Sequence, residues 1–206
     1  FPNGTRVLIQ SAVATAAGDN EFFMQVDPNN NDFVSVDFSG MQVYLGNGSV
    51  MGVPAPGSIV DVVGSIGEFG GALQLENVDQ LDNSGTTTLP PFTTVTATEV
   101  DTGGARADAL QGTLIQLQDV TVTNPNPDSP NDYGEFEIDG FRVDDLLFEI
   151  VPRPSLNDTF TTARGVLPAA TPRTIFPARA DRARASSPST SIGRGSGGTG
   201  PSAMST

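Results

Sequence analysis

The sequence predicts an all-β protein made of two tandem five-stranded β-barrels and an irregular C-terminal tail. Short segments in which apolar and polar residues alternate are typical of half-buried strands, and no segment has the period of a helix beyond one turn at residues 108–111. The same order of segments occurs twice along the chain. The 206 residues are enough for two domains of about 100 residues each.

Five strands are expected in the first half, in the order long, short, short, long and long. They span residues 6–15, 21–26, 41–45, 58–69 and 72–81. Gly64, inside the fourth strand, predicts a kink that lets this strand pass from one side of the barrel to the other. The Gly70–Gly71 pair predicts a tight corner with positive φ angles, with Glu68 facing outward and Phe69 inward.

The second half of the chain repeats these segments. GTRVLIQSAVATA from Gly4 resembles GTLIQLQDVTVTN from Gly112, NEFFMQV resembles GEFEID, and GMQVYL resembles GFRVDDL. The fourth segment, TFTTARGVL, carries Gly165 in the place of Gly64, and RTIFPAR at 173–179 is the candidate closing strand. Five strands in this order, with a long first strand and a kinked fourth strand, are typical of an OB-type barrel, whereas an immunoglobulin-like sandwich has about seven strands.

We expect the first OB-like barrel at residues 1–90, the second at 91–180 and a tail rich in Arg, Ser and Gly at 181–206. The link at 83–100 contains Pro90–Pro91, which stiffens the chain, and then TTVTATEV, which is expected to be extended. Beyond Leu167 the alternation stops, and the composition becomes typical of disorder. The last strand of the second barrel is therefore matched less well than the others.

The composition excludes several kinds of site. The chain has no Cys, His, Trp or Lys, which excludes disulfides, thiolate or imidazole metal sites and nucleophile–His pairs. Its formal net charge is −14: residues 1–167 hold 23 acidic residues and 5 Arg, and residues 168–206 hold 1 acidic residue and 5 Arg. This asymmetry predicts that the tail lies on an acidic body, its own or a neighbour's; a solvated tail is the simpler alternative.

The start and the composition of the chain favour export. The chain begins at Phe1 without an initiator Met, and it has neither a basic and apolar leader nor an apolar run approaching 18 residues. Thr, Asn, Asp and Gly are abundant. We therefore expect an extracellular protein or one at a bacterial cell surface, without a membrane span; an excised fragment would have the same features.

Five segments of the sequence resemble those of a known family. They are GTRV, NEFFMQVDP, PGSIVDVVGSIGEFGGALQLENV, LQGTLIQLQDVTVTN and YGEFEIDGFRVDD. Over residues 4–167 the chain resembles the OB-fold-like regions beside the catalytic domain of secreted bacterial endonuclease/exonuclease/phosphatase-type nucleases. The resemblance implies an exported, multi-domain context. It also implies a role without catalysis, because the metal–phosphate machinery of the nuclease domain is absent from this chain.

No catalytic residues are expected, because no nucleophile and base stand in a suitable pattern. Two loops offer the hard oxygen ligands that suit Ca²⁺ as a cofactor. The proposed ligands are Asp27, Asn29, Asn31 and Asp32 in the first loop and Asp128, Asn131, Asp132 and Glu135 in the second. Neither loop fits an EF-hand; in the first loop, Asp32 and Phe38 stand where the EF-hand pattern has Gly and Glu. Ordinary Asx turns are the alternative.

A ligand or assembly face is expected at three Phe and four Arg, namely Phe22, Phe23, Phe136, Arg173, Arg179, Arg182 and Arg184. Aromatic side chains on the second strands of OB barrels stack nucleic-acid bases, but the acidic body opposes phosphate. In the alternative, one residue of the Phe22–Phe23 pair lies in the core and the other packs on the neighbouring barrel.

These features together favour a non-enzymatic, exported structural or adhesive subunit. We expect it to self-assemble into a homo-oligomer or a polymer such as a filament, through strand edges and the basic tail. Segments 1–5 and 173–179 are candidates to add a strand to a neighbour. The alternative is an accessory glycan- or DNA-binding module of a secreted nuclease.

Overall fold

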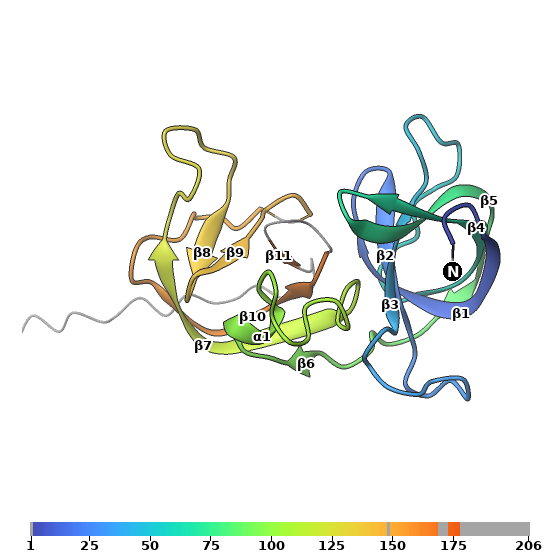
Figure 1. The fold of residues 1–206 in the computed structure, drawn as a ribbon, viewed down its shortest axis with the longest axis horizontal. Helices are drawn as coiled ribbons and strands as arrows, with labels where there is room; N and C mark the ends of the chain where they lie inside the picture. The colour runs from blue at the N-terminus through green and yellow to red at the C-terminus, as the bar shows by residue number, and fades with distance from the viewer. Residues whose placement is uncertain (1, 148, 169–172, 178–206) are drawn as a thin grey trace, which may run out of the picture.

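The computed structural model describes residues 2–147, 149–168 and 173–177, which form two β-barrels side by side (Figure 1). The first barrel closes in the order β1-β2-β3-β5-β4, because β1 and β4 pair. Only the β3–β5 pairing is parallel. Its strands are β1 (Arg6–Ala17), β2 (Glu21–Val26), β3 (Gly40–Tyr44), β4 (Ser58–Phe69) and β5 (Ala72–Thr86).

The second barrel repeats this topology. Its sheet has the order β10-β11-β9-β8-β7-β6, and an additional pairing of β10 with β7 closes the ring of five strands, with β6 alongside β7. The β9–β11 pairing is parallel, like the β3–β5 pairing of the first barrel. The elements are β6 (Thr93–Thr94), α1 (Ala97–Val100), β7 (Leu114–Asn124), β8 (Phe136–Ile138), β9 (Phe141–Val143), β10 (Thr159–Val166) and β11 (Thr174–Pro177).

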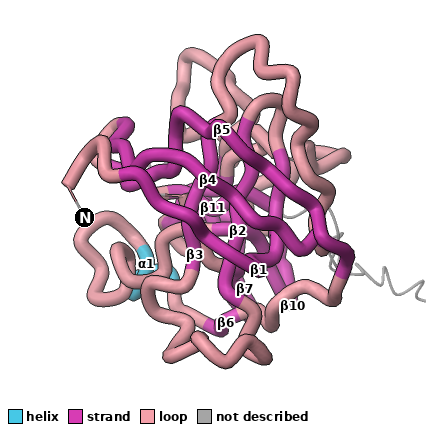
Figure 2. Tube along the Cα trace, turned by 90° about the vertical axis from the view of Figure 1, so that its right-hand side faces the viewer, coloured by secondary structure: helices cyan, strands magenta, loops and turns pink. Residues whose placement is uncertain are grey.

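The expectation of an all-β chain with two five-stranded barrels is therefore confirmed, as is the internal repeat. The candidate closing strand exists over Thr174–Pro177, whereas 178–179 and the tail at 181–206 lie outside the described residues. Strands make up most of the regular structure, and α1 is the single helix of the described residues (Figure 2). None of the described helical structure is long and apolar enough to cross a membrane.

Both rings of five strands are closed, which corrects the expectation of open barrels, although β6 pairs with β7 alone and keeps a free edge. The N–H of Gly4 donates to Ile66 O (2.7 Å), and the N–H of Ile66 donates to Thr5 O (2.8 Å), so the first residues pair with their own barrel. Thr174–Pro177 likewise pairs with its own β9 and β10. The described parts of both segments, Gly4 and Thr5 in the first and Thr174–Pro177 in the second, therefore already pair within the chain.

The two predicted glycine positions allow backbones to approach closely. At Gly64 the β4–β5 register shifts, and a Cβ there would lie 2.9 Å from Glu76 O. At Gly165 a Cβ would lie 2.2 Å from Phe176 O. A side chain at either position would collide with the neighbouring strand, so the fourth strand of each barrel needs its glycine.

The corner between β4 and β5 forms as predicted, but one side chain points the other way. Gly70 (φ 61°) and Gly71 (φ 84°) make the two-residue turn, and Glu68 is exposed. Phe69, predicted to face inward, is 75% exposed. It stands three positions after the buried core residue Ile66, so strand alternation places it on the opposite face.

The link also differs from its predicted extended form, because α1 occupies Ala97–Val100. The Glu99 carboxylate accepts hydrogen bonds from the Thr96 N–H (2.7 Å) and the Thr96 hydroxyl (2.8 Å). The bond from the Thr96 N–H is one half of a capping box, in which the Thr96 side chain in turn accepts from the Glu99 N–H, and the spacing Thr-x-x-Glu is visible in the sequence. The hydrogen bonds to the carboxylate, chiefly the one from the backbone, lower the pKa of Glu99.

Candidate functional site

The two barrels meet on the outer face of β2. Phe22 and Met24 point into the core of the first barrel, whereas Phe23 and Gln25 face the second barrel. Phe23 is fully buried and meets Phe176 of β11 edge to face, with ring centroids 6.1 Å apart. The interpretation that one residue of the Phe22–Phe23 pair is core and the other packs on the neighbouring barrel is confirmed.

A buried side-chain amide also crosses this joint. Gln25 is 1% exposed, and its Oε1 accepts a hydrogen bond from the N–H of Leu114 (3.1 Å), the first residue of β7. A buried N–H left without an acceptor costs about 1–3 kcal/mol. The first barrel therefore satisfies a buried backbone donor of the second barrel, which ties the relative position of the two barrels to the geometry of one hydrogen bond.

The backbones themselves touch beside this amide. A Cβ added at Gly40 would lie 2.3 Å from the carbonyl carbon of Gly112, and one added at Gly112 would lie 2.5 Å from Met41 N. Nearby, the Gln111 Nε2 donates to Leu73 O at 2.7 Å. The joint therefore extends from β2 across β3 to the start of β5.

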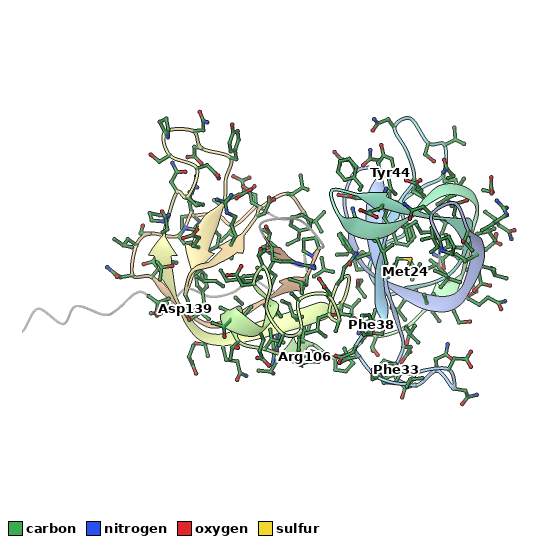
Figure 3. All side chains as sticks on the ribbon, in the orientation of Figure 1. Met24, Phe33, Phe38, Tyr44, Arg106 and Asp139 are labelled. Carbon is green, nitrogen blue, oxygen red and sulfur yellow. The ribbon has the colours of Figure 1, made fainter. Side chains whose placement is uncertain are left out.

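The loop between β2 and β3 clamps the joint from one side. Val36 packs against the core of the second barrel, and Asp37 accepts from Arg106 at 2.6 Å. The N–H of Phe38 donates to Ala109 O at 2.6 Å. Figure 3 shows Phe33, Phe38 and Arg106 on this side of the molecule. The loop of the first barrel is thus held by the second.

An arginine on the outer face of β9 organises the loops of the second barrel. Arg142 Nη1 lies 3.0 Å from Asp128 Oδ1 and 2.5 Å from Glu135 Oε2. Burial raises the pKa of Glu135 above 4.5 although Arg142 opposes the change, and burial also raises the pKa of Asp144. Sequence reasoning named Asp128 and Glu135 as candidate metal ligands but missed their pairing with Arg142, which lies on another element, β9.

A second arginine fastens the same loop. Arg153 donates to Pro125 O (3.0 Å) and Glu135 O (2.6 Å), and it pairs with Asp132. The hydrogen bond from Arg153 is the main cause of the lowered pKa of Asp132. The long loop between β7 and β8 is therefore held by two guanidinium groups.

The candidate calcium ligands are arranged as Asx turns and ion pairs. In the first loop, Asp27 accepts from Asn29 N–H (2.8 Å), and the Asn30 side chain accepts from Asp32 N–H (3.0 Å). In the second loop, the carboxylates contact arginines as described above, and the N–H of Asn131 donates to Asp128 O. Among the described residues, no three acidic side chains gather as metal ligands. Calcium binding at either loop stays a prediction.

The expected ligand face is wrong for its three aromatic residues, because strand alternation turns each of them inward or onto the joint. Phe22, Phe23 and Phe136 are all buried, and Phe136 stacks on Phe160 inside the second barrel. No base can stack on them in this arrangement. Arg173 is 9% exposed; it donates to Pro168 O and pairs with Asp108. Three further arginines, Arg179, Arg182 and Arg184, lie outside the described residues.

No family model matches the chain, and searches of curated proteins and of solved structures found no match either. The resemblance to the barrels of secreted nucleases stays a prediction.

Proposed function

We propose that this protein is a non-enzymatic, exported structural or adhesive subunit that self-assembles, at a bacterial cell surface or outside the cell. The observation that supports the proposal is the joint, in which Phe23 packs on Phe176 and Gln25 binds Leu114. A joint of this kind gives a two-barrel body whose two ends have a fixed relative orientation. Such a body is suited to repeated contacts that build an open assembly.

The charge distribution supports a contact between the acidic body and the basic tail. Most arginines of the described residues already pair within the body: Arg6 with Asp79, and Arg106, Arg142, Arg153 and Arg173 with the partners given above. Arg164 donates to Gln116 Oε1 and lies over the Phe92 ring, and the other positive charges of the sequence are Arg179, Arg182, Arg184 and Arg194. We propose that they bind the acidic body of a neighbouring copy, since opposite charges steer association.

The experiment compares the full chain with a chain that ends at Pro177. This truncation keeps β11, which belongs to the second barrel. A full-length variant in which the four tail arginines become serine is the matched control for charge. Light scattering and negative-stain electron microscopy are expected to show ordered polymers of the full chain, lost in both variants and weakened by salt.

The measurement is repeated with and without Ca²⁺ at about 1 mM, a concentration suited to extracellular sites. A polymer that needs Ca²⁺ would support the predicted loop sites. A monodisperse monomer under every condition would contradict the proposed assembly. Binding measurements with DNA and polysaccharides would then test the accessory-module alternative.

A further inference from the structure

We propose that Asn47 is a site of spontaneous deamidation, at which the side-chain amide is lost and an aspartate or isoaspartate residue forms. The reaction needs no enzyme and takes water as its only co-reactant. Asn47 is followed by Gly48, in the loop between β3 and β4. The inference goes beyond the proposed function and does not depend on it, because it concerns the chemistry of one turn.

The reaction starts at the backbone nitrogen of Gly48. This nitrogen loses its proton and attacks Asn47 Cγ; the N–Cγ bond forms, the Cγ–Nδ2 bond breaks, and Nδ2 leaves as ammonia with that proton. Water then opens the five-membered ring. Cleavage of the N–Cγ bond gives aspartate, whereas cleavage of the bond between the nitrogen and the main-chain carbonyl carbon gives isoaspartate. Glycine favours the attack because no side chain shields its nitrogen.

The first observation is the exposed turn in which both residues stand. The Ser49 N–H donates to Gly46 O at 3.3 Å, which places Asn47 and Gly48 at the two central positions. The φ of Gly48 is 77°, close to the value at the third residue of a type II turn. Asn47 and Gly48 are both exposed, and a Cβ added at Gly48 would have no atom within 4 Å. Water and hydroxide therefore reach the Gly48 nitrogen.

The second observation concerns the two groups that react. Among the described residues, none accepts a hydrogen bond from the N–H of Gly48. The Asn47 Oδ1 accepts a hydrogen bond from Asn20 Nδ2 at 2.7 Å. This hydrogen bond stabilises the negative charge that develops on Oδ1 during the attack, so Cγ becomes a better electrophile. The turn thus exposes the nucleophile and polarises the carbonyl that it attacks.

The third observation is the contrast with the other Asn-Gly pair of the sequence, Asn3–Gly4. This pair also lies exposed at the centre of a turn, closed by the Thr5 N–H and Pro2 O (3.1 Å), and the φ of Gly4 is 81°. The Gly4 N–H, however, donates to Ile66 O at 2.7 Å. Because this bond must break before the Gly4 nitrogen can react, the fold protects this pair and leaves the other one open.

The products change the surface of the first barrel. Each reaction adds one negative charge to a chain whose formal net charge is −14. Aspartate keeps an acceptor for Asn20, whereas isoaspartate adds a carbon atom to the main chain and disturbs the turn that the Ser49 N–H closes. Both products are stable, so they are expected to accumulate with the age of the protein.

The test is incubation of the folded full chain at about pH 8, followed by peptide mapping by mass spectrometry with chromatographic separation of aspartate from isoaspartate. Asn47 is expected to lose its amide at least about 5-fold faster than Asn3, which is the effect of one backbone hydrogen bond. The rate at Asn47 is expected to rise with pH, because the Gly48 nitrogen attacks without its proton. Asn47→Gln is the matched variant: its longer side chain needs a six-membered ring, so loss of ammonia at this position should nearly stop while Asn3 is unaffected.

The same measurement in concentrated urea separates the fold from the dipeptide sequence. Both turns are lost there, so the rates at Asn47 and Asn3 are expected to become similar. Equal rates in the folded chain, or faster loss at Asn3, would overturn the assignment of Asn47 as the site. Loss at Asn47 in urea without loss in the folded chain would also overturn it, because the turn would then protect the residue. None of these outcomes bears on the proposed assembly, which is measured separately by light scattering.

Discussion

Phe23 of β2 and Phe176 of β11 meet edge to face between the two barrels, with ring centroids 6.1 Å apart and ring planes inclined at 69°. The residue before Phe176, Ile175, lies in the core of the second barrel. One short strand therefore closes the second barrel with one side chain and fastens it to the first barrel with the next. Closure of the second barrel and formation of the joint are coupled for this reason.

Replacing Phe23 by Ala tests the aromatic contact. Loss of a fully buried Phe is expected to lower the free energy of unfolding by about 3–5 kcal/mol. A double-mutant cycle of Phe23→Ala with Phe176→Ala, measured by urea denaturation, should give a coupling energy of about 0.5–1.5 kcal/mol. A control cycle of Phe22→Ala with Phe176→Ala should give a value close to zero, since Phe22 lies in the core of the first barrel. Equal coupling in both cycles would contradict a specific contact.

Gly165→Ala tests the close approach of β10 and β11. The added Cβ would lie 2.2 Å from Phe176 O and 2.7 Å from Ile175 Cγ1, so we expect a loss of about 3 kcal/mol or more in the free energy of unfolding. Gly52→Ala is the control, because no atom lies within 4 Å of its added Cβ, and its effect should stay within about 0.5 kcal/mol. A Gly165→Ala protein with wild-type stability would show that the two strands are further apart.

Arg142→Met tests the loop cluster of the second barrel. Arg142, Asp128 and Glu135 have side chains that are 22%, 18% and 17% exposed, so removing the guanidinium leaves two largely buried carboxylates unpaired. We expect a loss of about 2–3 kcal/mol at pH 7, measured by thermal unfolding. Adding Asp128→Asn and Glu135→Gln to Arg142→Met should recover most of the lost stability, because no unpaired carboxylate then remains. A triple variant no more stable than the single one would mean that Arg142 acts through packing instead.

Asp144→Asn tests the effect of burial on a carboxyl group. Burial raises the pKa of Asp144 above 3.8, so the folded state binds this proton more tightly than the unfolded state. The ionised group then destabilises the fold at neutral pH, and this effect disappears as the pH falls through the raised pKa to below 3.8. Asn keeps the acceptor that Asp144 Oδ1 offers to Leu146 N–H.

We therefore expect Asp144→Asn to have a higher melting temperature than the wild type at pH 7 and an equal one below pH 3.8. Asp19→Asn, at an exposed position, controls for the loss of one negative charge from an acidic chain. The same gain in Asp19→Asn would assign the effect to net charge. A gain for Asp144→Asn that persists at low pH would contradict the role of ionisation.

Local signals in the sequence were sufficient to predict most of the fold. The strands, the glycines at 64 and 165 and the Gly70–Gly71 turn follow from alternation and backbone chemistry, which act over a few residues. The inward prediction for Phe69 is wrong, because strand alternation from the core residue Ile66 places Phe69 on the opposite face. The spacing of Thr96 and Glu99 fits a capping box, whereas the β-branched residues around them favour an extended chain.

The contacts at the joint and around Arg142 could not be predicted from local signals, because the residues that meet there are distant in the sequence. Gln25 meets Leu114 only after the two barrels have docked, whereas Arg142 meets Asp128 once the second barrel has closed. Arg173 is buried against Pro168 and Asp108, which also belong to the second half of the chain. The sequence could predict that one residue of the Phe22–Phe23 pair faces the neighbouring barrel, because adjacent residues in one strand face opposite sides of the sheet, but not which of the two does so.

The most direct measurement asks whether the two barrels form one unit. Amide signals of Val43 in β3 and Ile138 in β8 can be followed by NMR through a urea titration of the full chain. The joint predicts that both signals disappear at the same urea concentration, and that Phe23→Ala separates the two midpoints. Two well-separated transitions in the wild type would contradict a single two-barrel body, and with it the basis of the proposed structural role.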